Sequence, residues 1–84
     1  MDIEYSKKAA KTINNLDNKL KQRIQQAILG LPDGDVKRII GRVDTWRLRV
    51  GDWRVLFSQS DNDTILIEKI STRGQAYKGG FIII

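Results

Sequence analysis

Arginines in two neighbouring stretches of alternating sequence are the residues whose type and spacing point most directly to chemistry. Arg47 and Arg49 alternate with apolar residues, and Arg54 lies in the next alternating stretch. Because every second residue of a strand faces the same side, we expect these guanidinium groups to gather on one face of a sheet. Planar guanidinium groups are suited to clamping phosphate oxygens. The pattern therefore indicates a site for an anion.

The charge of the whole chain favours an anionic partner such as nucleic acid. Fifteen Lys and Arg against ten Asp and Glu give a net charge of +5, and residues 36–54 hold six basic residues against two acidic ones. A basic segment of this kind is a common, though not unique, feature of nucleic-acid-binding proteins. The flanking basic residues that we expect to contact the same partner are Lys37, Arg38, Arg42 and Lys78.

The residue types that are missing exclude several other chemistries. The chain has no cysteine and no histidine, so a thiolate nucleophile, a disulfide framework and a histidine base are ruled out. We expect no metal and no small-molecule cofactor. Residues 1–5 lack the apolar core of a secretory signal, and no stretch approaches the ~20 apolar residues of a membrane span. The sequence therefore predicts a cytoplasmic protein with no membrane partner.

A single small domain has to position these side chains. With 84 residues the chain can build one core, so we expect one domain over residues 1–84. After a short first strand at Ile3 and Tyr5, apolar residues recur every three or four positions over 9–31, which predicts helix. Residues 14–18 are a poor helix interior, which indicates two helices in a hairpin. The expected N-caps are Ser6 and Asp17, with Gly30 ending the second helix.

Alternation replaces the helical period after the turn-rich residues 31–35. It predicts strands at 46–50 and 53–58, joined by a two-residue turn at Gly51 and Asp52, and a third strand at about 64–71. The expected fold class is α+β: an N-terminal strand, a helix hairpin and an antiparallel three-strand meander, with the helices packed on one sheet face.

The register of the predicted hairpin places two arginines directly opposite each other. Counting outward from the turn pairs Arg49 with Arg54, on the face away from the apolar residues. Opposed like charges disfavour a hairpin by a few tenths of a kcal/mol or more, so an anion between them is an attractive explanation. A solvated face neutralised by acids is the alternative. Glu68 is the acid expected nearby, and one acid cannot balance three arginines.

The end of the chain holds two further candidate features. Arg73 and Tyr77 are four residues apart, which would bring them to one side if a helical turn begins there, whereas an ordinary strand terminus would leave Tyr77 packed on its own. The apolar tail Phe81–Ile84 would be an aggregation hazard if free. We expect it to return to the core or to a sheet edge as a short strand.

Residues 46–57 resemble the central hairpin of the RelE/ParE toxin superfamily. Residues 70–78 resemble its C-terminal segment, in which an Arg precedes a Tyr by four. The helix at 17–31 and Arg42 also fit, so the resemblance covers nearly the whole chain. The hairpin pattern identifies the superfamily strongly and specifies the activity less well.

In the RelE branch the resemblance implies cleavage of messenger RNA in the ribosomal A site and inhibition by a cognate antitoxin protein. The residues that match the catalytic positions are Arg47, Arg49, Arg54, Arg73 and Tyr77. Two of these are Arg where some relatives have Lys, which favours phosphate clamping over proton transfer. Thr72 stands where many relatives have His, which argues against a histidine-based mechanism. The matched basic positions imply binding of messenger RNA and the ribosome.

The implied reaction suits this set of residues. RNA carries its own nucleophile, the 2′-hydroxyl, and needs no metal if the enzyme orients that group and stabilises charge on the phosphate. Tyr77 could accept a proton with help from neighbouring Arg charge, or stack on a displaced base. Two alternatives stay open: a ParE-like poison of DNA gyrase without nuclease activity, and a non-catalytic nucleic-acid-binding domain. Presence of the full arginine and tyrosine set argues for the nuclease.

Overall fold

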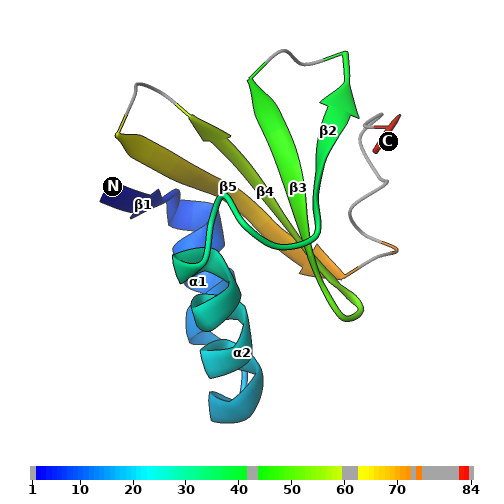
Figure 1. Cartoon of the computed structure of the whole chain (residues 1–84). Helices are drawn as coiled ribbons and strands as arrows, with labels where there is room; N and C mark the ends of the chain where they lie inside the picture. Colours follow the sequence, from blue (N-terminus) through cyan, green and yellow to red (C-terminus); the bar gives the residue numbers. More distant parts are fainter. Residues whose placement is uncertain (1, 42–43, 60–62, 73, 75–81, 84) are drawn as a thin grey trace.

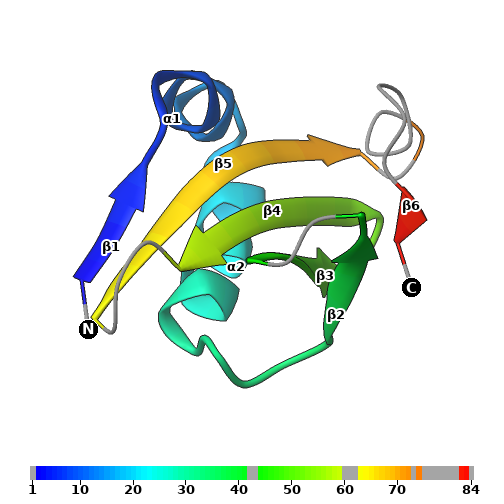
Figure 2. The same cartoon turned by 90° about the horizontal axis from the view of Figure 1, so that it is seen from above.

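Helices and strands cover most of the chain in this computed structural model, which describes residues 2–41, 44–59, 63–72, 74 and 82–83. In chain order the elements are β1 (Asp2–Tyr5), α1 (Lys7–Asn14), α2 (Asn18–Leu29), β2 (Val36–Ile40), β3 (Thr45–Val50), β4 (Trp53–Gln59), β5 (Thr64–Thr72) and β6 (Ile82–Ile83). The two helices lie on one face of a single twisted sheet (Figures 1 and 2). The predicted α+β class and the predicted helix hairpin are confirmed.

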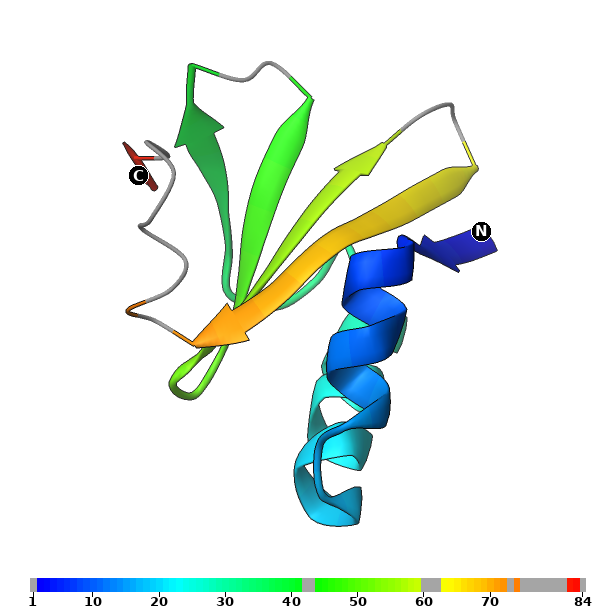
Figure 3. The same ribbon diagram turned by 180° about the vertical axis from the view of Figure 1, so that it is seen from behind.

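The helix boundaries follow from local capping. Ser6 accepts a hydrogen bond from the Ala9 N–H at 3.0 Å, and Asp17 accepts one from the Leu20 N–H at 2.9 Å, as an N-cap side chain should. The Ser6 hydroxyl also donates to the Glu68 carbonyl at 2.7 Å, which ties the start of α1 to β5. Figure 3, seen from behind, shows α1 following directly on β1 and lying against β5.

The sheet is more complex than the predicted meander. Its strand order among the described residues is β1-β5-β4-β3-β2-β6. The antiparallel meander β3-β4-β5 is confirmed, but β1 pairs in parallel with β5, and β2 adds an antiparallel strand beside β3. The prediction of a simple three-strand meander is therefore wrong. It missed β2 because residues 36–40 read apolar, polar, polar, apolar, apolar and show no period of two.

The end of the chain returns to the sheet edge. Ile82 and Ile83 form β6, which pairs antiparallel with Ile40 and Ile39 of β2. This confirms the prediction of a short returning strand for these two residues. Phe81 and Ile84, the other residues of the predicted tail, lie outside the described part of the chain.

The β3-β4 turn sets the register of the candidate site. Val50 pairs with Trp53 and Arg49 pairs with Arg54, as predicted. Gly51 has a φ of +59°, a conformation that glycine adopts without steric cost. A Cβ atom at this position would also stand 3.0 Å from a guanidinium nitrogen of Arg23. The exposed guanidinium end of Arg23 can move aside, so the positive φ is the reason that this turn favours glycine.

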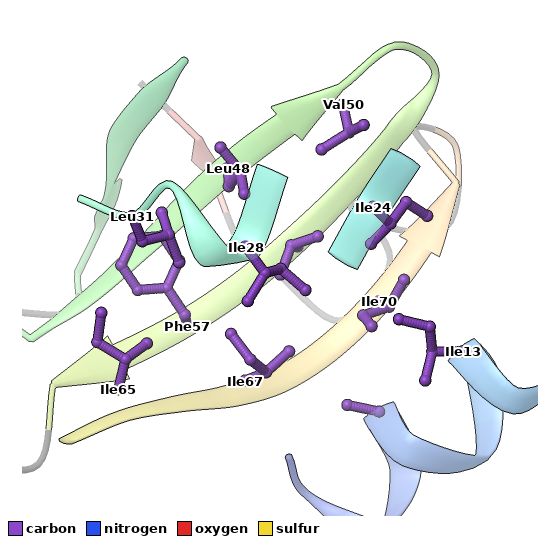
Figure 4. Packing of buried hydrophobic residues seen from close by; sticks show 12 residues of the cluster. Ile13, Ile24, Ile28, Leu31, Leu48, Val50, Phe57, Ile65, Ile67 and Ile70 are labelled. Carbon is purple, nitrogen blue, oxygen red and sulfur yellow. The ribbon is translucent and has the colours of Figure 1, made fainter. Parts of the chain in front are cut away.

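The main core lies between the helices and the sheet. Figure 4 shows Ile28 of α2 among Leu48, Phe57 and Ile67 of the strands, and Ile24 nearer to Val50 and Ile70. The face away from the helices is not simply solvated, because Ile39 and Leu56 are buried outside this cluster. By strand alternation and register, both side chains lie on the same face as the arginines of β3 and β4.

Candidate nucleic-acid interface

Strand register arranges the basic residues in rows across the face away from the helices. Directly paired residues of neighbouring strands point to the same face. One row runs Arg49, Arg54, Ser71 across β3, β4 and β5. The adjacent row runs across β2 to β5 and consists of Lys37, Arg47, Leu56 and Lys69. The predicted gathering of Arg47, Arg49 and Arg54 on one face is therefore found.

Arg47 is buried and has its own counter-charge. The residue is 6% exposed. Its Nη1 donates to the Asp35 backbone carbonyl at 3.0 Å and lies 3.3 Å from the Asp35 Oδ1. A buried cation is tolerated where a paired carboxylate and hydrogen bonds compensate it. The guanidinium therefore joins β3 to the residue before β2, and at Arg47 the neutralising acid is Asp35.

Arg49 is the accessible guanidinium of the three. Its side chain is 56% exposed, and its Nη1 lies 3.9 Å from the Asp35 Oδ2. An exposed ion pair at this distance contributes between about 0 and 1 kcal/mol. Arg49 can therefore exchange Asp35 for an external anion at low cost.

Arg54 lies on the predicted face and pairs with Arg49, but its side chain is buried there. It is 6% exposed, because its guanidinium folds back onto its own turn. Its Nη1 donates to the carbonyl oxygens of Gly51 at 2.9 Å and Trp53 at 3.0 Å. Within the described ranges, no carboxylate forms an ion pair with Arg54. This cation is held by backbone dipoles beside Arg49, a residue of the same charge.

Asp35, an acid that the sequence did not single out, pairs with two arginines of the basic face. Asp35 belongs to the turn before β2 and contacts both Arg47 and Arg49. Glu68, the acid expected near the arginines, is the extra residue of a bulge between Ile67 and Lys69 in the β4-β5 register. The signal that could have identified Asp35 is its position immediately before Val36, which pairs with Leu48 between the two arginines.

The remaining predicted residues divide into two groups. Lys37 pairs with Arg47 and lies on the same face, whereas Arg38 pairs with Trp46 and lies on the face that carries the helices. The four candidates outside the described residues are Arg42, Arg73, Tyr77 and Lys78. The described part of the site therefore combines one accessible and two buried arginines with an exposed lysine.

In the described part of the chain, no group of three or more Asp or Glu side chains is arranged to hold a metal ion. No helix of that part is long and apolar enough to cross a membrane.

Comparison with solved structures identifies the class of fold. A chain of the crystal structure of the RelB-RelE antitoxin-toxin complex from Methanococcus jannaschii superposes with a TM-score of 0.71 and 24% sequence identity, covering 88% of this chain and 94% of that chain. The fold is therefore RelE-like. Residues 3–77 match the model of the family described as ParE toxin of type II toxin-antitoxin system, parDE. The chain belongs to this family, which confirms the predicted superfamily. No curated protein gave a significant match.

Proposed function

We propose that this member of the ParE toxin family is an endoribonuclease that cleaves messenger RNA in the ribosomal A site. The observation that carries the proposal is the pairing of an accessible guanidinium, Arg49, with a buried one, Arg54, that has no described carboxylate partner. Two opposed cations favour an anion between them. A phosphodiester of RNA has the charge and the acceptor oxygens for this place.

The reaction follows from the chemistry of RNA. The 2′-hydroxyl attacks the adjacent phosphorus, the bond to the 5′-oxygen breaks, and a 2′,3′-cyclic phosphate forms. Arg54 is held by backbone carbonyls, so its charge is in place before the substrate arrives, which is the condition for electrostatic stabilisation of a transition state. Arg49 adds a second guanidinium. The resemblance adds Arg73 as a further phosphate ligand and Tyr77 as a base or stacking residue.

Mapping RNA ends tests this proposal. The protein would be expressed briefly under an inducible promoter, and messenger RNA ends would be sequenced before and after induction. We expect new ends within translated regions, carrying a 2′,3′-cyclic or 3′-phosphate. Products with a 5′-phosphate would rule out the 2′-hydroxyl mechanism. For arginine variants that lose RNA cleavage, Lys19→Met is the control for loss of one positive charge. Lys19 is exposed on α2, on the other side of the sheet.

A gyrase poison is the second candidate, and the description of the matching family as ParE toxin favours it. Such a toxin acts by binding a protein and needs no arginine cluster. Purified DNA gyrase would be incubated with the protein and plasmid, and the DNA examined for cleavage and loss of supercoiling. Gyrase inhibition with intact messenger RNA would replace the nuclease proposal.

We also propose a cognate antitoxin that covers the helix hairpin and reaches the basic face. The structural neighbour is a complex of an antitoxin with a toxin, and an acidic partner segment would meet Arg49 and Lys37. The helical apolar stripe is mostly packed on the core, with Leu29 of α2 left exposed. Co-expression with the neighbouring reading frame should give a stable complex that cleaves no RNA; failure to form one excludes that partner.

A further inference from the structure

Asp35 contacts two arginines of this face through both its backbone carbonyl and its carboxylate. Its backbone carbonyl accepts from the Arg49 N–H at 2.9 Å and from the Arg47 Nη1 at 3.0 Å. Its carboxylate is divided between the two arginines: Oδ1 lies 3.3 Å from the Arg47 Nη1, and Oδ2 lies 3.9 Å from the Arg49 Nη1. The Asp35 side chain is 47% exposed, so solvent and ligands reach it.

The two contacts of the carboxylate differ in strength. Arg47 is buried, so its short contact with Asp35 persists in any state that keeps the fold. Arg49 is exposed and its contact is long, so screening by water and salt weakens it. A phosphate that approaches Arg49 therefore competes with Asp35 for one guanidinium group and leaves the other pair intact.

We propose that Asp35 is a positioning residue of the phosphate site, acting through Arg49; the inference rests on the nuclease function proposed above. The carboxylate aligns Arg49 beside Arg54 and weakens its hold on a ground-state phosphodiester. The transition state of 2′-hydroxyl attack carries more negative charge than the diester, so it draws Arg49 from Asp35 more strongly. Interactions that strengthen in the transition state raise kcat.

Asp35→Asn is the direct test, because it removes the charge and keeps the backbone carbonyl that binds both arginines. Asp33→Asn is the matched control: Asp33 lies in the same turn, is exposed, and its carboxylate is in no ion pair described for this chain. Both variants lose one negative charge, so the net charge of the protein rises by one in each. A difference between them therefore reports the place of the carboxylate and not the net charge.

Binding and cleavage are measured separately. Binding uses a 2′-O-methyl oligoribonucleotide, which cannot be cleaved, in a fluorescence anisotropy titration at fixed salt. We expect Asp35→Asn to bind it about two- to five-fold more tightly than Asp33→Asn, the size of an exposed ion pair. Cleavage at saturating RNA should fall by about two- to five-fold for Asp35→Asn alone, so that KM and kcat decrease together. Asp35→Glu should recover part of kcat.

Equal binding by the two variants, or an unchanged kcat in Asp35→Asn, would overturn the proposal. If the wild-type protein leaves RNA intact, the nuclease function fails, and the binding comparison alone decides the role of Asp35. If Asp35→Asn does not fold, the wild-type protein still gives a test. The carboxyl ¹³C signal of Asp35 should move when the oligonucleotide is added, and should not move in Arg49→Gln; the same response in both proteins overturns the proposal.

Discussion

Replacing Arg54 with methionine is expected to leave the folded protein about as stable as the wild type while removing its activity. Arg54 is buried on the sheet face away from the helices, and its guanidinium bonds to the carbonyls of Gly51 and Trp53. Methionine has a long, flexible side chain of comparable reach and carries no charge. The substitution therefore removes the cation and keeps most of the packing.

Opposing contributions of similar size set the expected stability change. Two hydrogen bonds from a charged donor contribute about 1.5 to 3 kcal/mol each, and both are lost. In return, the variant no longer buries a guanidinium whose desolvation costs several kcal/mol, and the repulsion from Arg49 disappears. We expect the free energy of unfolding to stay within about 2 kcal/mol of the wild-type value.

Urea unfolding followed by tryptophan fluorescence measures this change, and growth inhibition with RNA-end mapping measures activity. Loss of one preorganised donor is expected to lower the cleavage rate by about 100-fold or more. Lys19→Met, with the same change of charge, should keep both stability and activity. If Arg54→Met lowers the free energy of unfolding by more than about 3 kcal/mol, the reasoning is refuted, because Arg54 would then be a structural residue. A stable and fully toxic variant would remove Arg54 from the site.

Three further outcomes are expected. Gly51→Ala should lower the free energy of unfolding by about 1 kcal/mol or more, because φ at this residue is +59°; an unchanged urea midpoint would contradict this. Burial raises the pKa of Tyr5 above 10.0, so the folded state disfavours its ionised form. The contribution of Tyr5 to stability should therefore be fully present below pH 10.0 and be lost as pH rises through the raised pKa. Tyr5→Phe should reduce the loss of stability in alkaline unfolding titrations. Arg73→Ala should fold normally and lose growth inhibition; a toxic variant would exclude Arg73 from the site.

Local signals in the sequence were sufficient to predict much of this fold. The N-cap residues Ser6 and Asp17 begin the two helices, and the turn at Gly51 fixes the pairing of Arg49 with Arg54. Each of these features depends on a few consecutive residues. Capping geometry and positive φ are properties of short segments, so a single sequence carries the information.

Pairing between distant segments was harder to predict. The strand β2 has no alternating pattern, and its place in the sheet depends on β3 on one side and on β6 on the other. The parallel pairing of β1 with β5 likewise joins strands that lie far apart in the sequence. Such contacts are decided by which surfaces remain unpaired after the local elements form.

Alternation predicted the face on which each arginine lies, but not its exposure. Exposure depends on partners: Arg47 is buried with Asp35, and Arg54 is buried against its own turn. The site is therefore built from cations that the fold holds in place, with Arg49 exposed beside them. Groups that are fixed before a ligand binds pay little reorganisation when charge develops. Burial of Arg54 without a described carboxylate, which is unfavourable for stability alone, is consistent with a role at a phosphate.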